Sequence, residues 1–405
     1  MATLALKGGI PVCTAGWPRY PTLGAEEEAA AVRVVRSHNL SAQFGEEVRA
    51  FEAEFAAYLG SEHAIAVCNG TAALHTALAA AGVGAGDEVI VPPYTFVATA
   101  TSVLLQNAIP VFVDIEPRTQ GLDPRAVAER ITPRTRAIIP VHMNGYPMEI
   151  EALMEVARQR NLVVIEDCSH AHGAMVGERK VGTFGQINAF SCQQKKNLSL
   201  GEGGLVVTND AGLAARARGF HSFSAAPLST NYRLPELHGA IGRVRLSQLD
   251  AHNDARIRNA RYLDEALFGL PGIQAQRPRP GTKAVYYNYI LHIDPEVLGF
   301  DKQTFVKALR AEGIPASGGY SPVHRDALFK QRNAYGRGCP FTCPFYAPTE
   351  AERPRYDDEA FPVVEELCRS RNVELKIHPP AGPEEMADVA TAVRKVVEAR
   401  AELAA

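Results

Sequence analysis

Apolar positions follow two alternating periods from about residue 26 to about residue 250. Segments with apolar residues three or four positions apart predict helices over 26–36, 46–58, 71–81, 96–106 and 150–160. Short runs that are apolar throughout predict strands over 64–67, 88–91, 111–113, 137–141 and 162–165. Strands that alternate with helices of this length pair in parallel, and apolar residues on both strand faces require helices on both sides of the sheet. We therefore predict an α/β fold with a mostly parallel central sheet.

The pattern changes beyond residue 236. A long charged amphipathic stretch over 236–269 predicts a connecting helix, and Pro271, Pro278, Pro280 and Gly281 punctuate the chain after it. The remainder mixes short strand-like and helical segments and ends in a predicted helix over 384–402. A chain of 405 residues is long for a single core. We predict a large domain over residues 1–255, including an N-terminal arm, and a smaller α+β domain over residues 256–405.

Composition narrows the classes of function. The formal net charge is −3 and charged residues make up 21% of the chain, which argues against a nucleic-acid footprint. No apolar run approaches the roughly 18 residues of a membrane span, and the start lacks the apolar core of a signal peptide. The 7 cysteines are scattered along the chain and indicate reduced thiols rather than a disulfide framework. We expect a cytoplasmic protein that binds neither nucleic acid nor membrane.

The first candidate for chemistry is the turn Asn69-Gly70-Thr71, which follows a predicted strand and opens a predicted helix. A helix N-terminus offers free amide donors and the positive end of the helix dipole, so it suits a phosphate, and the Thr71 hydroxyl can add a further donor. The alternative is an ordinary N-capped helix, since Asn and Thr are common caps.

The second candidate is Asp167, which follows the predicted strand at 162–165. A carboxylate there lies at the carboxyl edge of the sheet, where it can hold the protonated ring nitrogen of a cofactor. It can equally cap the next helix or pair with an arginine. The nearby His170 and His172 read equally well as ordinary loop histidines. As a pair without a third ligand they are weak metal ligands, and we predict no metal site.

The third candidate is Lys196, which lies before the glycine-rich turn Gly201-Glu202-Gly203-Gly204 and a predicted strand at 205–208. A lysine in a desolvated site with a second cation nearby loses its proton more readily and becomes a nucleophilic amine. Against this, most lysines are solvated surface residues, and a doublet such as Lys195-Lys196 usually is too.

The order of these three motifs resembles that of the fold-type-I pyridoxal-phosphate (PLP) enzymes. Shorter local matches are similar to the DegT/DnrJ/StrS family of sugar aminotransferases and cover residues 8 to 397. They lie at Phe51–Phe55, Asn69–Leu74, Gly86–Pro92, Thr95–Thr99, Pro140–His142, Glu166–Asp167, Ala171–Ala174, Gly201–Gly204, Asn231–Leu234 and Glu236–Gly242. The resemblance implies an aspartate-aminotransferase-like fold, with a large PLP-binding domain and a smaller α+β C-terminal domain.

The resemblance also implies roles for single residues. Lys196 would carry PLP as a Schiff base and move the substrate proton, and Asp167 would pair with the pyridine nitrogen. Phe96 would stack on the ring, and His170 would lie near its phenolic oxygen. The implied phosphate contacts are Gly70, Thr71 and Ser191, and Ala72 is implied as a further cofactor-binding residue. Asn231 would reach the phosphate of a partner subunit, which implies a homodimer with shared active sites. The implied substrate contacts are His142, Tyr320 and His324.

This chain departs from the family pattern beside the lysine. Cys192 stands where the family has an aromatic residue, and Lys195 stands where it has a small or hydroxylated one. A second ammonium would lower the pKa of Lys196 if both faced the site, although neighbours on an extended strand point to opposite faces. An exchange of roles between the two lysines therefore stays open. The pair Cys339 and Cys343 is outside the family pattern and offers only two metal ligands, so an insertion or covering loop is the simpler interpretation.

The implied reaction moves an amino group from glutamine or glutamate to a carbonyl acceptor. Three features resemble the branch that acts on scyllo-inosose, deoxy-scyllo-inosose and aminohydroxybenzoate precursors, which serves antibiotic and other secondary metabolism. They are the start Gly8–Val12 followed by Trp17–Tyr20, the pair Gln193-Gln194, and Gly201–Gly204. A keto-cyclitol acceptor is therefore expected. The alternatives are a nucleotide-linked keto-sugar, a PLP-dependent lyase or dehydratase reaction at the same site, and a PLP-binding regulator without turnover.

Overall fold

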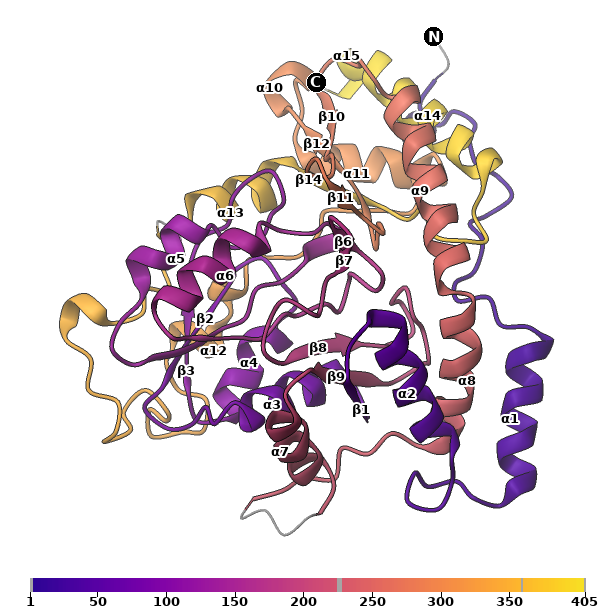
Figure 1. Ribbon diagram of the computed structural model, residues 1–405. Helices are drawn as coiled ribbons and strands as arrows, with labels where there is room; N and C mark the ends of the chain where they lie inside the picture. Colours follow the sequence, from indigo (N-terminus) through magenta and orange to yellow (C-terminus); the bar gives the residue numbers. More distant parts are fainter. Residues whose placement is uncertain (1–2, 224–227, 358–359, 404–405) are drawn as a thin grey trace.

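The central sheet is continuous across the molecule in the computed structural model, which describes residues 3–223, 228–357 and 360–403 (Figure 1). Its strands, in spatial order, are β3 (Ile109–Phe112), β2 (Glu88–Val91), β4 (Thr135–Ile138), β5 (Val163–Val164), β8 (Asn188–Ser191), β9 (Gly204–Thr208) and β1 (His63–Val67). Parallel bridges from Asp167 to Val141 and to Ala189 join the two halves. Neighbouring strands are parallel except where β9 pairs, so the predicted mostly parallel sheet is confirmed.

Two apolar cores cover the two faces of this sheet. Alternate residues of one strand enter different cores: Val89 and Val91 pack on one side, and Ile90 packs on the other. The first side is covered by α3 (Gly70–Ala80), α4 (Ala98–Leu105) and α7 (Ala211–His221). The second side is covered by α2 (Glu47–Leu59), α5 (Pro124–Arg130), α6 (Ile150–Gln159) and α8 (Glu236–Ser247). This double burial explains why the strands are apolar throughout.

A smaller antiparallel sheet organises the C-terminal part, in the order β10 (Ile273–Ala275), β12 (Tyr289–Ile293), β14 (Asn372–Leu375) and β13 (Ala316–Ser317). It forms a third core with α9 (Leu249–Ala266), α11 (Lys302–Ala311) and α14 (Pro383–Glu398). Helix α1 (Ala25–Ser37) has 13 residues. The other α-helices and strands are short: β6 (Met175–Val176), β7 (Arg179–Lys180), β11 (Thr282–Lys283), α10 (Pro295–Leu298), α12 (Ala327–Lys330), α13 (Pro362–Glu366) and α15 (Arg400–Leu403).

The N-terminal segment packs on this third core, near the C-terminus (Figure 1). Leu4 and Cys13 belong to the core, and the buried carboxylate of Glu312 accepts hydrogen bonds from the amides of Ala5 (2.8 Å) and Val12 (3.1 Å). The predicted N-terminal arm therefore contacts the smaller unit. The predicted boundary at residue 255 falls inside α9, and the division into domains stays a prediction.

The long helix predicted over 236–269 is two helices, α8 and α9, that meet at Gln248. The Gln248 side chain accepts a hydrogen bond from Arg245 (3.0 Å) and donates one to Glu26 on α1 (3.0 Å). Helix α1 therefore contacts the junction between α8 and α9. The predicted C-terminal helix is likewise two, because α14 ends at Glu398. No helix among the described residues has the length and apolar character to cross a membrane.

Candidate active site

A cavity of about 710 Å³ lies where the central sheet meets the C-terminal unit. It is bordered by residues that follow β1, β2, β4 and β5 in the chain and by the end of β8. Eight residues predicted from the sequence line it: Gly70, Thr71, Phe96, Asp167, His170, Ser191, Lys196 and Tyr320. The three motifs that were separate in the sequence therefore share one site, as expected at the carboxyl edge of a parallel sheet.

The carboxylate of Asp167 is held in a fixed orientation. One oxygen accepts from the Thr99 hydroxyl at 2.9 Å and the other from the Ser169 amide at 3.1 Å. Thr99 in turn lies 2.7 Å from the Thr95 hydroxyl. Asp167 is only 4% exposed but lines the cavity, so its carboxylate faces a ligand rather than bulk water. Such a carboxylate can hold a cationic ring nitrogen.

One end of the cavity is suited to an anion. Helix α3 begins there, with the Asn69 side chain accepting from the Ala72 amide at 2.8 Å. Gly70 approaches β8 so closely that an added Cβ would lie 2.5 Å from the Cβ of Ser191. The first-turn amides and the hydroxyls of Thr71 and Ser191 can therefore bind a phosphate. Ala72 does not line the cavity, and its amide is already used by the cap.

Lys196 lines the cavity and is buried, whereas its neighbour Lys195 is exposed. The Tyr20 hydroxyl donates to the Lys196 carbonyl at 2.6 Å and itself accepts from the buried Arg256 at 3.1 Å. The Lys196 Nζ lies 4.8 Å from the centre of the Tyr287 ring. Burial lowers the pKa of Lys196 to about 8, against the opposing attraction of Asp167 and with the further repulsion of Lys376. The two lysines are thus distinguished by their surroundings, although both border the cavity.

His170 forms part of an aromatic wall. Its ring stacks on Tyr287 with 4.0 Å between centres and an angle of 10°. Its Nδ1 accepts from the Asn144 amide at 3.3 Å, so in the neutral ring Nε2 carries the proton. Burial lowers the pKa of His170 well below its usual value and keeps the ring neutral. Phe96, 54% exposed, meets Tyr320 edge to face at the mouth of the cavity.

Three other predicted residues lie outside the cavity lining. His142 is buried beneath it: Nδ1 accepts from the Met148 amide, and Nε2 lies 3.0 Å from the carboxylate of Glu166. His324 is buried against Phe361, with Nε2 2.9 Å from the Glu365 carboxylate. Asn231 is exposed and accepts from Arg233 at 2.9 Å. None of these three residues lines the cavity.

The Glu166 carboxylate near His142 is a structural anchor. It also accepts from the amides of Gly182 (2.9 Å), Phe184 (2.6 Å) and Gly185 (2.8 Å). His142, Glu166 and Cys168 are close enough together to hold a metal ion. However, backbone amides and the histidine occupy the carboxylate, and the Met148 amide occupies the other ring nitrogen. These hydrogen bonds fix the strand end that carries Asp167.

The wall that the C-terminal unit contributes was not predicted from the sequence. The additional lining residues there are Tyr287, Asn288, Ser317, Glu374 and Lys376. A signal was present in the strict alternation of polar and apolar residues from Asn372 to Ile377, which is typical of a strand with one buried apolar face. The polar residues of this segment face cavity residues that lie far away in the sequence. The alternation alone therefore could not place the segment at the site.

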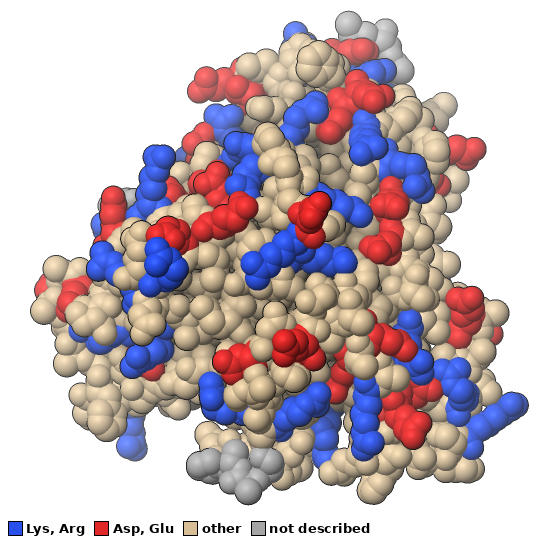
Figure 2. Space-filling view, viewed as in Figure 1, with Lys and Arg blue, Asp and Glu red and all other residues tan. Residues whose placement is uncertain are grey.

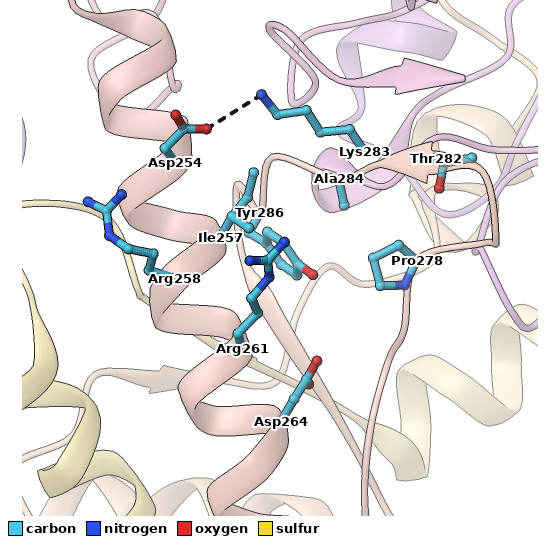
Figure 3. A pocket seen from close by; sticks show the side chains of 10 residues that line it. All are labelled: Asp254, Ile257, Arg258, Arg261, Asp264, Pro278, Thr282, Lys283, Ala284 and Tyr286. Atoms are coloured by element: carbon cyan, nitrogen blue, oxygen red, sulfur yellow. Dashed lines mark ion pairs between the residues drawn. The ribbon is translucent and has the colours of Figure 1, made fainter. Parts of the chain in front are cut away.

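A second cavity, of about 660 Å³, lies beside α9 and contains no predicted site residue (Figure 3). Its basic side chains include the exposed Arg258 and Arg261 on α9, and Lys283 lies 3.5 Å from Asp254. Acidic and basic side chains are likewise interspersed over the face of the molecule in Figure 2. This face presents no extended patch of one charge.

Comparison with known proteins agrees with the geometry of the first cavity. The model of the DegT/DnrJ/EryC1/StrS aminotransferase family matches residues 21–349. The chain belongs to this family. It is therefore an aminotransferase, and the expected fold class and enzyme class are confirmed.

Individual relatives are similar over most of the chain. L-glutamine:2-deoxy-scyllo-inosose aminotransferase of Streptoalloteichus tenebrarius is 37% identical, over 99% of this chain and 99% of its own. The dTDP-3-amino-3,4,6-trideoxy-alpha-D-glucose transaminase of Streptomyces venezuelae is 40% identical, over 68% and 74%. The crystal structure of 3-amino-5-hydroxybenzoic acid synthase superposes with a TM-score of 0.84 at 29% identity, covering 96% and 99%.

The Lys196 amine should titrate near pH 8, because burial lowers its pKa to about 8. A lysine reacts with an aldehyde only when neutral, so in the apoprotein reductive methylation of Lys196 should reach half of its maximum near pH 8 and level off above about pH 9. Mass spectrometry of the peptide that contains Lys196 measures this profile. A rate of methylation that still rises steeply at about pH 10 would contradict the assignment.

Proposed function

We propose that this aminotransferase uses PLP to move the amino group of glutamine or glutamate to a keto-cyclitol in secondary metabolism. The observation that carries the proposal is the convergence of a buried amine, a fixed carboxylate and an anion-binding helix start in one cavity. The relative from Streptoalloteichus, which spans 99% of both chains, supports the choice of glutamine and a cyclitol.

The residues of the cavity fit PLP. The close approach of Gly70 to Ser191 leaves a cradle that a single Cβ would fill, beside the free amides of α3. We assign this end to the phosphate, with Gly70, Thr71 and Ser191 as its contacts. Asp167 would hold the pyridine nitrogen, and Lys196 would form the Schiff base. Phe96 would pack on the ring, and the Nε2 of His170 would donate to the phenolic oxygen.

When bound, PLP supplies an aldehyde and an electron-withdrawing ring. The protein supplies proton movements and orientation around it. Asp167 keeps a proton on the ring nitrogen, because its own carboxylate is held by Thr99 and Ser169. Lys196, released as a neutral amine, moves the proton at the substrate carbon, for which a pKa of about 8 is well suited. The wall of Tyr287 and His170 excludes water from this side.

Two other reactions are alternatives to amination of a keto-cyclitol. The transaminase from Streptomyces venezuelae, 40% identical, favours a nucleotide-linked keto-sugar as the second candidate. A lyase or dehydratase would use the same cofactor contacts but break another substrate bond. We propose a cytoplasmic location, which is supported by free cysteines at all 7 positions, as a reducing compartment requires.

We propose that the enzyme is a homodimer in which Asn231 reaches the partner's phosphate end. The position is exposed, and the neighbouring Phe223 and Leu228 are 68% and 77% exposed apolar residues on the same segment. Mixing inactive Lys196→Ala and Asn231→Asp subunits should restore about a quarter of wild-type activity, since half of the dimers are mixed and each holds one intact site. Mixtures that stay inactive, although native mass spectrometry detects mixed dimers, would refute shared sites.

Replacing Lys196 should abolish turnover, because it removes the buried amine that we assign to the Schiff base and to the proton transfer. In Lys196→Ala we expect at least a thousandfold loss of transamination and no visible Schiff-base absorption, while PLP still binds through its phosphate. Lys195→Ala is the matched control and should retain the Schiff base. Borohydride reduction followed by peptide mapping measures which lysine is attached. A cofactor found on Lys195 would overturn the assignment.

A further inference from the structure

The polar face of β14 forms a wall of the cavity that the proposed cofactor contacts do not use. Along Asn372–Ile377, the residues Val373, Leu375 and Ile377 enter the third apolar core. The alternate residues point to the other face, as strand geometry requires. Asn372 is satisfied there by hydrogen bonds with Gln120 and Tyr94, whereas Glu374 and Lys376 line the cavity.

Glu374 presents an unused acceptor. Its side chain is 5% exposed, and Oε2 accepts from the Ser317 hydroxyl at 2.9 Å across the β13–β14 pair. Oε1 is buried and has no hydrogen-bond partner among the described residues. Gly319, at φ +78°, leaves room for it: an added Cβ would lie 3.3 Å from Oε1. Buried carboxylate oxygens are almost always paired, so an unpaired one beside a cavity indicates a ligand that donates.

Lys376 presents a cation to the same space. Its Nζ lies 5.2 Å from the centre of the Tyr287 ring, which Lys196 approaches at 4.8 Å, and it donates to the side chain of Asn288. The other described cations that line the cavity are Lys196, assigned to the Schiff base, and the exposed Lys195. Lys376 is therefore the part-buried cation left for an anionic group of a substrate.

We propose that Glu374 and Lys376 form a substrate subsite that serves the two half-reactions separately. Lys376 binds the carboxylate of the amino donor, and Glu374 accepts a hydrogen bond from a hydroxyl of a neutral polyhydroxylated acceptor. The inference rests on the proposed function, because a transaminase admits first an amino acid with its carboxylate and then a neutral carbonyl compound to one cavity. The carboxylate of Glu374 on β14 and the ammonium of Lys376 just beyond the end of that strand provide contacts of both kinds.

Two unreactive probes test binding in the donor half-reaction and in the acceptor half-reaction separately. Glutarate mimics the donor and is titrated into protein loaded with PLP; scyllo-inositol mimics the acceptor and is titrated into protein loaded with pyridoxamine 5′-phosphate. Isothermal calorimetry measures both dissociation constants without turnover. Lys376→Met should weaken glutarate binding by about tenfold or more, since a charge-assisted contact is lost, and leave scyllo-inositol within about twofold. Lys376→Arg should recover most of the glutarate affinity.

Glu374 should show the opposite selectivity. The isosteric Glu374→Gln should weaken scyllo-inositol binding by about tenfold and leave glutarate binding equal or tighter, because a nearby negative charge is removed. Lys283→Met and Glu151→Gln, outside the cavity, are controls that should change neither constant. Thermal unfolding of each variant shows whether it is folded. Glu374→Asp takes the place of Glu374→Gln if that variant is not folded.

The outcomes distinguish this inference from the proposed function. Variants that shift both probes by the same factor, or shift neither, overturn the subsite while leaving the aminotransferase assignment intact. Failure of the wild-type protein to bind either probe overturns it as well. Failure of the wild-type protein to take up either form of the cofactor instead overturns the proposed function.

Discussion

The burial of one amine determines what chemistry this cavity can perform. Water strongly stabilises the charged form of a lysine. Because burial removes water from around Lys196, the pKa of its amine falls to about 8. The opposing carboxylate of Asp167 keeps that pKa from falling further. The balance depends on the parts that enclose the amine: the turn after β8, the Tyr20 hydroxyl on the Lys196 carbonyl, and the Tyr287 ring. The site is therefore built jointly by the central sheet, the N-terminal segment and the C-terminal unit.

Neighbouring side chains on extended backbone point to opposite sides, so adjacent residues can have different roles. Glu166 turns toward the interior, where three amides and His142 occupy its oxygens, while Asp167 turns toward the cavity. The same rule separates Leu375, in the third core, from Lys376 in the cavity wall. In both places the buried residue, Glu166 or Leu375, fixes the backbone. Its neighbour, Asp167 or Lys376, is thereby positioned in the cavity wall.

Local sequence signals predicted the part of the site that lies on the central sheet. Asp167 and the Gly70-Thr71 turn follow apolar strands directly, and strand ends of a parallel sheet meet at one edge. The family resemblance then singled out Lys196, which its position in a lysine doublet would not have done. The wall formed by Glu374 and Lys376 could not be predicted, because these residues lie more than 170 positions from Lys196 in the sequence and only the folded chain brings them to the same cavity. His142 was placed near the substrate by resemblance, yet its ring lies under the sheet edge with both nitrogens engaged.

The most direct test of the account follows the nitrogen atom itself. The purified protein with PLP is incubated with glutamine labelled with nitrogen-15 at its α-amino group, together with 2-deoxy-scyllo-inosose, and the products are examined by mass spectrometry. The account predicts an aminated cyclitol that carries the label, formed in equal amount with the 2-oxo acid of glutamine. Unlabelled aminated product, whose nitrogen would then come from the side-chain amide, would contradict it. So would the absence of aminated cyclitol when a parallel incubation with a nucleotide-linked keto-sugar yields a labelled amino sugar.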